Sequence, residues 1–176
     1  MINLAATNGN ILVLNKLITD ISVDAILPKM LCDELIKCFN DVDEFDVIND
    51  RIGITFSTPD FTLTSRLIEG MYPKYEQLIP TSTATNVTLD KQQILDALDL
   101  LSIVKNERTN VCVLEFDNNS LKITASNADN GEGAIDLDID YDFEPLKIAF
   151  NMEYLKGIFK NVCNDDVFEL GLNDIS

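Results

Sequence analysis

Histidine and tryptophan are both absent from this chain of 176 residues. Histidine is the commonest general base near neutral pH and the commonest ligand of transition metals, so its absence argues against enzymes that depend on it. Cysteine is scarce: Cys32, Cys38, Cys112 and Cys163 show no CxxC spacing. Without histidine to complete a mixed zinc site, we interpret them as reduced, mostly buried thiols and expect no metal or other cofactor.

Long apolar runs are missing as well. No stretch approaches the roughly 20 residues that a membrane-spanning helix needs, and the start at 1–4 lacks the charged region of a signal peptide. We therefore expect a cytoplasmic protein that makes no membrane contact. The chain is 46% hydrophobic and 24% charged, which is typical of a globular protein with one good core or two small ones.

Positive charge is in short supply, with 13 basic residues against 30 acidic ones and a net charge of -17. Three segments, Pro28–Asn40, Asp90–Lys105 and Asn151–Val162, have the apolar periodicity of helices. They hold six basic and six acidic residues, which leaves seven basic and 24 acidic residues elsewhere. The helices are therefore neutral enough to face DNA, although charge alone favours the simpler interpretation that their lysines form a solvated face.

A weak internal repeat runs through the chain at an offset of roughly 120 residues, which is the size of a domain. Leu4–Asn10 resembles Ile123–Asp129. The helix at Pro28–Asn40 and the segment Phe45–Asp50 parallel a second set, which is Asn151–Val162 and Phe168–Asp174. The chain is thus built from two related copies.

The two copies extend in opposite directions. The first continues through predicted strands at Ile52–Phe56 and Phe61–Leu67, which have no counterpart after the second copy. The second is preceded by the predicted helix at Asp90–Lys105 and a strand at Val111–Phe116, which have no counterpart before the first. The pattern predicts the end of one domain joined to the beginning of its sibling.

Residues 65–80 connect the copies, with a turn at Gly70 and prolines at Pro73 and Pro80. A generic linker is rich in small polar residues. This connector instead carries large apolar and aromatic side chains, namely Met71, Tyr72, Tyr75, Leu78 and Ile79. Its composition favours a surface that packs or binds another molecule.

The run from Ser65 to Pro80 closely resembles the interdomain signature of the bacterial DNA polymerase III beta subunit, the sliding clamp. Leu121–Ala125 and Ile148–Leu155 extend the resemblance over nearly the whole chain. It implies an α+β DNA-clamp fold of pseudo-repeated domains, with helices on the inner face and antiparallel sheets outside. Residues 1–80 would be the C-terminal part of clamp domain two plus the connector. Residues 81–176 would be the N-terminal part of domain three without its final strands.

The resemblance implies a noncatalytic DNA polymerase processivity factor, or a fragment of one, that tethers the replicative polymerase to duplex DNA. The expected partners are duplex DNA, the DNA polymerase III catalytic subunit and the clamp loader. The catalytic subunit and the loader would bind through short peptide motifs, and the chain would form a ring-like homo-oligomer.

One alternative is a stand-alone clamp-like regulator that competes for the clamp or its partners. Another is a metal-dependent hydrolase that uses the acidic segment Ile135–Asp142. Tyr141 and Lys147 occupy the positions where an EF-hand loop needs glycine and glutamate, so a strand with a solvated acidic face explains that segment better.

The resemblance also assigns a cleft for partner peptides. It would comprise Thr7, Gly9, Leu12, Pro73, Tyr75 and Leu78. Without the resemblance, Leu12 and Leu78 would be taken as ordinary core residues. The family usually has Thr-Asp-Gly-His-Arg-Leu at 7–12, so the charge of that loop is lost here. In the family a final C-terminal strand completes the cleft, and this chain stops before it, so we expect weak peptide binding unless another chain supplies the strand.

Two further surfaces follow from the resemblance. The residues expected to face DNA are Lys29, Lys37, Lys91, Lys156 and Lys160. Ile103 and Val104 match an apolar pair at the face where domain three meets domain one of a second subunit. A head-to-tail ring needs two different patches, so this chain alone is not expected to close the family's ring. Unpaired strand edges at both ends of the copies would favour self-association.

Overall fold

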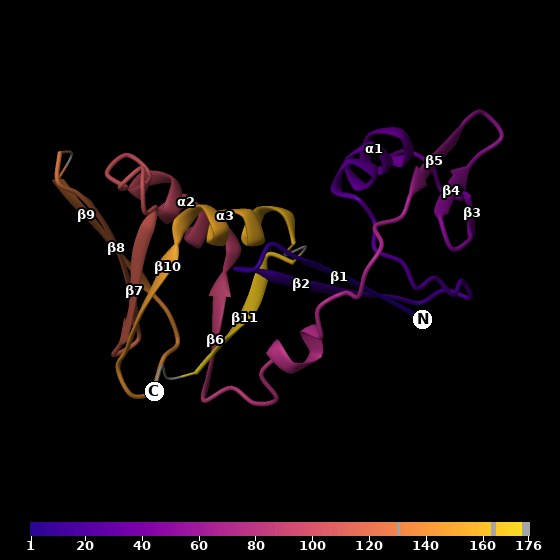
Figure 1. Ribbon diagram of the computed structural model, residues 1–176. Helices are drawn as coiled ribbons and strands as arrows, with labels where there is room; N and C mark the ends of the chain where they lie inside the picture. Colours follow the sequence, from indigo (N-terminus) through magenta and orange to yellow (C-terminus); the bar gives the residue numbers. More distant parts are fainter. Residues whose placement is uncertain (130, 163–164, 174–176) are drawn as a thin grey trace. The chain divides into compact units, whose positions relative to one another are not determined.

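A computed structural model describes residues 1–129, 131–162 and 165–173 (Figure 1). The chain divides into two compact units, Met1–Ile79 and Pro80–Ser176. They are called unit 1 and unit 2 below, and each is described by itself.

Unit 1 begins with a hairpin of β1 (Ile2–Thr7) and β2 (Leu12–Leu17), followed by α1 (Lys29–Phe39). A second antiparallel sheet follows, in the order β3 (Asp46–Asn49), β4 (Gly53–Ser57) and β5 (Thr62–Arg66). The connector then forms the short 3₁₀ helix η1 (Tyr75–Leu78).

The core of unit 1 lies between α1 and the β3-β4-β5 sheet. Leu31 and Phe39 from α1 are buried with Ile54 and Phe56 from β4. The ring of Phe39 makes edge-to-face contacts with three other phenylalanines, which are Phe45, Phe56 and Phe61. Such contacts add specific geometry to the apolar burial and fix the helix on the sheet.

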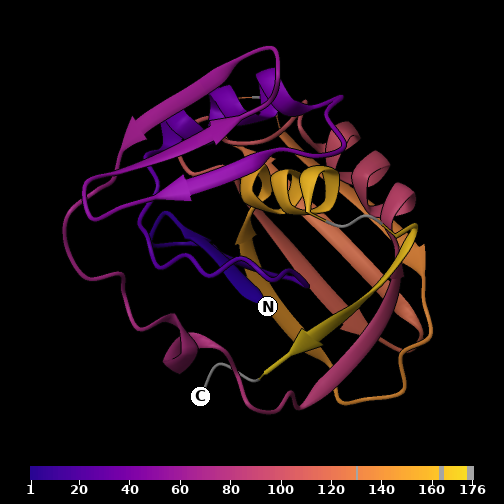
Figure 2. The ribbon, with the colours of Figure 1, turned by 90° about the vertical axis from the view of Figure 1, so that its right-hand side faces the viewer.

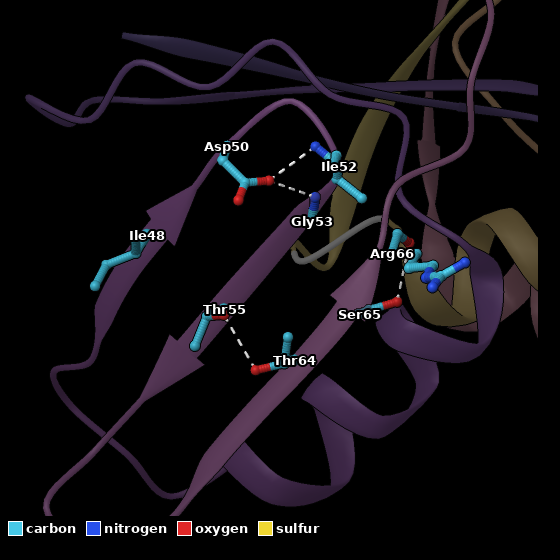
Figure 3. Close-up of a pocket in the computed structure, with 8 residues that line it drawn as sticks. All are labelled: Ile48, Asp50, Ile52, Gly53, Thr55, Thr64, Ser65 and Arg66. Atoms are coloured by element: carbon cyan, nitrogen blue, oxygen red, sulfur yellow. Dashed lines mark hydrogen bonds between the residues drawn. The ribbon is translucent and has the colours of Figure 1, made fainter.

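The β3-β4-β5 sheet also bears a pocket of about 400 Å³ (Figure 3). Thr55 and Thr64 face each other across the strands with their hydroxyls 3.1 Å apart. At the hairpin before β4, the backbone N–H groups of Ile52 and Gly53 both donate to Asp50 at 2.8 Å. These two hydrogen bonds hold the pKa of Asp50 below its ordinary value.

Unit 2 opens with β6 (Thr85–Asp90), which runs directly into α2 (Lys91–Leu101). The strands that follow are β7 (Val111–Asp117), β8 (Ser120–Asn127), β9 (Gly131–Asp138) and β10 (Leu146–Asn151). The unit then continues with α3 (Met152–Asn161) and β11 (Val167–Leu172). Its two antiparallel sheets have the orders β10-β7-β8-β9 and β11-β6.

The core of unit 2 follows from strict alternation along its strands. On β7 and β8 every second side chain is buried, namely Cys112, Leu114 and Phe116, then Leu121, Ile123 and Ala125. α2 contributes Ile94, Leu98 and Leu101 to the same core, and α3 contributes Met152, Leu155 and Phe159. The two helices lie side by side against the sheets (Figures 1 and 2).

Both helices of unit 2 begin at a side-chain cap. The carboxylate of Asp90 accepts from the N–H of Gln93, and the amide oxygen of Asn151 accepts from Glu153 and Tyr154. Such caps satisfy N–H groups that the first turn leaves without partners. The predicted helix starts at Asp90 and Asn151 are these cap residues, so both predictions were correct to within one position.

Two predicted boundaries were wrong. The helix expected to reach Lys105 ends at Leu101, and Ser102 turns its hydroxyl back to the carbonyl of Leu98 at 2.7 Å. The acidic strand expected to continue to Asp142 ends at Asp138. Tyr141 is buried there, and its hydroxyl donates to the carbonyl of Glu144 at 2.6 Å, which bends the chain out of the sheet.

The structure contains the internal repeat. The β1-β2 hairpin has Gly9 in its turn and the β8-β9 hairpin has Gly131 as the first residue of β9, each with a φ of +88°. Each hairpin is followed by a helix and then a strand, α1 with β3 and α3 with β11. Only unit 2 has a strand just before that helix, because β10 pairs with β7 and no described strand of unit 1 occupies the place of β7.

The prediction of mostly buried thiols was wrong for the described cysteines. Cys112 is buried, Cys32 is half-buried and Cys38 is exposed, while Cys163 lies outside the described residues. Burial raises the pKa of Cys112 to about 11, so its reactive thiolate is rare at neutral pH. Among the described helices, none combines the length and apolar character needed to cross a membrane.

Cysteine labelling tests these positions. We expect a maleimide at pH 7 to modify Cys38 first and Cys112 only after denaturant unfolds unit 2, because the Cys112 thiol is both inaccessible and protonated. Peptide mass mapping of the labelled protein distinguishes the sites. Labelling of Cys112 as early as Cys38 would contradict the described packing of β7.

Candidate functional site

The three predicted cleft residues near the N-terminus lie together in the β1-β2 turn. The hydroxyl of Thr7 donates to the carbonyl of Ile11 at 2.7 Å and accepts from the N–H of Gly9 at 3.1 Å. Gly9 has the positive φ that this turn requires, and Leu12 is half-buried at the start of β2. Thr7 therefore shapes the loop through backbone hydrogen bonds.

The three predicted cleft residues of the connector lie in and beside η1. The N–H of Tyr75 donates to the carbonyl of Pro73 at 2.8 Å and starts the short helix. Pro73 is exposed, Tyr75 is half-buried, and Leu78 is 68% exposed. An exposed leucine beside a proline and a tyrosine offers apolar area to a partner.

Tyr72 fastens the connector to the hairpin, although it was not among the predicted site residues. Its hydroxyl donates to the carbonyl of Ala5 at 2.9 Å, and its ring meets that of Tyr75 edge-to-face at 6.2 Å. The N–H of Asn8 donates to the carbonyl of Ile11, which makes these two residues a hydrogen-bonded pair of the hairpin. Bonded and non-bonded pairs alternate along an antiparallel ladder, so Ala5 belongs to a non-bonded pair and its carbonyl points away from β2. Tyr72 thus occupies the outer edge of β1, two residues from Thr7.

The arrangement joins two apolar segments of unit 1 through one hydrogen bond. The hairpin carries Thr7, Gly9 and Leu12, the connector carries Pro73, Tyr75 and Leu78, and the printed link between the two segments is the Tyr72–Ala5 hydrogen bond, so the cleft itself stays a prediction. A surface of this kind can anchor a few side chains of an extended peptide. The aromatic composition of the connector marked Tyr72 as a residue that packs or binds. Apolar periodicity could not predict that its hydroxyl bonds to the carbonyl of Ala5.

The predicted DNA-facing lysines of α1 are both paired with carboxylates on the same helix. Lys29 lies 2.6 Å from Asp33, and Lys37 lies 2.7 Å from Glu34. The hydrogen bond from Lys37 to Glu34 raises the pKa of the lysine. These exposed pairs are weak and screened by salt, but they reduce the positive charge that α1 presents.

Lys156 on α3 is held between the helices of unit 2. Its ammonium group donates to the hydroxyl of Ser102 at 3.0 Å and pairs with Asp99 at 2.5 Å, and its side chain is only 24% exposed. A second pair joins Lys105 to Glu153. Their hydrogen bond raises the pKa of Lys105 and lowers that of Glu153. In this structure Lys156 therefore links α2 to α3.

The remaining predicted lysines differ from each other. Lys91 is half-buried in the first turn of α2, where its N–H donates to the carbonyl of Asp166 at 2.8 Å. Lys160 is exposed on the last turn of α3, and no ion pair joins it to a described carboxylate. Lys160 is thus the predicted lysine whose charge is most available to a phosphate.

The predicted oligomer pair lies just beyond α2. Ile103 is 74% exposed and adjoins Leu100, which is 63% exposed. Val104 is half-buried and packs against the core of unit 2 beside Gly133, where any added side chain would collide with it. The structure therefore separates the pair into one surface residue and one packing residue.

The acidic segment that suggested a metal site forms a strand with a solvated face. Asp136 and Asp138 are exposed on β9, and Ile135 and Leu137 between them pack against the core. Across the described ranges, no three histidine, cysteine, aspartate or glutamate side chains gather closely enough to hold a metal ion.

Comparison with known proteins identifies the family. The family of the DNA polymerase III beta subunit, C-terminal domain, matches residues 76–175. The chain belongs to this family. It is similar to the beta sliding clamp of Pseudomonas aeruginosa, with 30% identity over 143 residues, covering 81% of this chain and 39% of the clamp. It is also similar to the beta sliding clamp of Synechococcus elongatus, with 34% identity over 121 residues, covering 68% of this chain and 32% of the clamp.

Solved structures place the fold in the same family. A crystal structure of the Pseudomonas aeruginosa sliding clamp bound to griselimycin matches 97% of this chain and 47% of that protein, with a TM-score of 0.90 and 28% identity. The expected α+β DNA-clamp fold is thereby confirmed. The chain spans less than half the length of these relatives.

The Tyr72 contact gives a first test of the site. Tyr72→Phe removes the hydrogen bond to Ala5, which contributes about 1 kcal/mol, so the connector should open about fivefold more often. We expect trypsin to cleave after the exposed Lys74 about fivefold faster in this variant. Tyr75→Phe is the matched control, because no hydrogen bond joins the Tyr75 hydroxyl to any residue that the structure describes. Equal cleavage of both variants would contradict the anchoring role.

The Lys156 pair gives a second test. Asp99→Asn removes one carboxylate partner of Lys156 and frees a positive charge between the helices. We expect its affinity for a 20-base-pair duplex, measured by fluorescence anisotropy, to become more sensitive to salt. One additional phosphate contact predicts a further loss of about 3-fold between 50 and 200 mM salt.

Asp136→Asn is the control for that experiment, because it makes the same change of net charge on β9. Its salt dependence should equal that of the unmodified chain. Equal effects of the two variants would show that only net charge matters and would contradict a specific role for the Lys156 pair.

Proposed function

We propose that this chain acts as a noncatalytic part of a DNA polymerase sliding clamp, a processivity factor that tethers the replicative polymerase to duplex DNA. Unit 1 corresponds to the end of clamp domain two and unit 2 to the beginning of domain three. Two matches carry the proposal. The family match covers unit 2, and a clamp structure with a TM-score of 0.90 covers almost the entire chain.

Partner proteins would bind on the surface formed by the hairpin and the connector of unit 1. Its apolar members are Leu12, Pro73, Tyr75 and Leu78, and Thr7 and Gly9 fix the loop beside them. Short peptide motifs of the DNA polymerase III catalytic subunit and of the clamp loader would be its natural ligands. A few anchored apolar side chains are sufficient for recognition of an extended peptide.

DNA would be held loosely. Lys29, Lys37 and Lys156, which are proposed to face DNA, are paired with carboxylates, and the net charge of the chain is -17. Non-specific DNA affinity comes from counterion release by unpaired basic groups, and typical values are about 10⁻⁴ to 10⁻⁶ M. The chain alone should lie at the weak end of that range, which suits a protein that retains DNA by encirclement within an oligomer.

Griselimycin is bound to the similar Pseudomonas aeruginosa clamp in its crystal structure, and the proposal places the griselimycin site of this chain on the partner surface. We expect the full chain to bind griselimycin in isothermal titration calorimetry, and Leu78→Ser to weaken binding by about tenfold or more. Burial of one leucine side chain contributes about 1.5–3 kcal/mol, which corresponds to that factor.

The matched control is Ile48→Ser, because Ile48 is 67% exposed and Leu78 is 68% exposed. Ile48 lies on the β3-β4-β5 sheet of unit 1, outside the proposed partner surface (Figure 3). Its replacement should leave griselimycin binding unchanged. Absence of binding by the unmodified chain, or equal loss in the two variants, would overturn the assignment of the surface.

A further inference from the structure

The turn of the β1-β2 hairpin contains an asparagine that is followed directly by a glycine, Asn8 and Gly9. Both residues are exposed. Gly9 has a φ of +88°, and no described atom lies within 4 Å of the position that a Cβ would take there. The peptide bond between the two residues is therefore open to solvent, and no side chain at position 9 shields it.

Two hydrogen bonds hold the side chain of Asn8 over the turn. Its amide oxygen accepts from the N–H groups of Asn10 and Ile11, both at 3.0 Å. Asparagine side chains commonly bond to the backbone two residues further along the chain. Donors that already point at an oxygen stabilise negative charge that develops on it during a reaction. The side-chain carbonyl carbon of Asn8 is thus prepared for attack by a nucleophile.

The backbone nitrogen of Gly9 is tethered to that carbon and closes a five-membered ring when it attacks. Tethering makes such an attack intramolecular, and a glycine lets the backbone rotate into the required geometry. The N–H of Gly9 donates to the hydroxyl of Thr7 at 3.1 Å. The net contribution of one hydrogen bond is small, so this exposed bond opens readily and releases the nitrogen.

We propose that Asn8 is a site of spontaneous deamidation, and that the isomerised product opens the hairpin turn of the partner surface. Hydroxide removes the proton from the nitrogen of Gly9, and this nitrogen forms a bond to the side-chain carbonyl carbon of Asn8. The bond from that carbon to its amide nitrogen breaks, and the nitrogen takes a proton from water and leaves as ammonia. Water then opens the cyclic imide at either carbonyl, which gives aspartate or isoaspartate.

The two products have different effects on the turn. Aspartate keeps a side-chain oxygen where Asn8 accepts its two N–H groups. Isoaspartate carries the chain through the former side chain, which inserts a methylene into the backbone and removes that acceptor. The register that places Thr7 opposite Leu12 is then lost. Both residues belong to the proposed partner surface, so the effect on binding rests on the proposed function.

Two other asparagines serve as internal references. Asn106 has the same side-chain bonds, because its oxygen accepts from the N–H groups two and three residues further on, at 3.0 and 3.2 Å. It is half-buried and is followed by Glu107. Asn118 is exposed in the turn between β7 and β8, as Asn8 is in its own turn, but it is followed by Asn119. Asn8 combines the bonds, the exposure and the following glycine.

The first test is incubation of the full chain in mildly alkaline buffer, followed by peptide mass mapping. We expect Asn8 to be modified about tenfold faster or more than Asn106 and Asn118, because its nucleophile is tethered and unshielded. Asn130, which also precedes a glycine, lies outside the described residues and is mapped on a separate peptide. Modification of Asn106 or Asn118 as fast as that of Asn8 would overturn the proposal.

Gly9→Asn tests the role of the glycine. Asparagine adopts a positive φ more readily than other residues with a side chain, and the structure has room for that side chain. We expect the modification of Asn8 to slow by about tenfold, because the added side chain restricts the backbone at the attacking nitrogen. Circular dichroism shows whether the variant is folded. An unchanged rate in the folded variant would also overturn the proposal.

The second test compares the isoaspartate form, separated by ion exchange, with the fresh chain. Hydrogen exchange at the Ile11 amide should become about fivefold faster or more, because its bond to Asn8 is lost. Griselimycin binding should weaken by about tenfold or more, because Leu12 leaves the partner surface. An isoaspartate form with unchanged Ile11 exchange, or with unchanged binding, would overturn the proposed effect.

Asn8→Asp, incubated in the same way, is the matched control. It carries the aspartate product without isomerisation and retains Asn130, so it should bind griselimycin as tightly as the fresh chain. Equal loss of binding in this variant would overturn the role of the isomerised backbone. Lack of binding by the fresh chain would contradict the proposed function instead. The mass map and the Ile11 exchange would still test the modification, so the two failures are distinguishable.

Discussion

The pairing of β6 with β11 is the interaction on which the structure of unit 2 depends. It joins the first described strand of the unit to the last, and Val87, Leu89 and Leu172 are buried along it. α2 starts directly at the end of β6, with Asp90 as its cap, so the same pairing sets where α2 begins. α2 and α3 pack against the core of unit 2, and the second sheet, β10-β7-β8-β9, buries one of its faces against the same core. The interactions that link α2 to α3, including the Lys156 contacts, follow from this closure.

Unit 1 shows what remains when that pairing has no counterpart. Its sheet ends at β3, its helix exposes Ile36 and Met30, and its core is limited to one helix on one three-stranded sheet. Aromatic contacts around Phe39 compensate in part by packing four rings together. The connector of unit 1 exposes Pro73 and Leu78, which a partner-binding surface requires.

The helices could be predicted from their apolar periodicity and their cap residues. Leu31, Leu98 and Leu155 each belong to an apolar pattern with three- and four-residue steps, which places the buried side chains on one face of a helix. The repeat was also visible in the sequence, since hairpin turns depend on local residues such as Gly9 and Gly131. The end of α2 and the bend at Tyr141 could not be predicted in this way. Each depends on a contact that is outside the apolar pattern, from Ser102 to Leu98 and from Tyr141 to Glu144. For the candidate site, the residue types pointed to an apolar surface. The pairing of Lys156 with Asp99 across two helices depends on tertiary packing.

Native-state hydrogen exchange of the purified chain tests the closure of unit 2 most directly. The N–H of Lys91 donates to the carbonyl of Asp166 at one end of the β6–β11 ladder. Hydrogen-bonded pairs recur at every second position of an antiparallel ladder, so Val87 and Leu170 also form a hydrogen-bonded pair. The account predicts that both amides exchange in the same slow class as those of β7 and β8, because all four strands share one cooperative core. Fast exchange at Val87 and Leu170, with β7 and β8 still protected, would contradict it and would show that unit 2 folds without the β6–β11 pair.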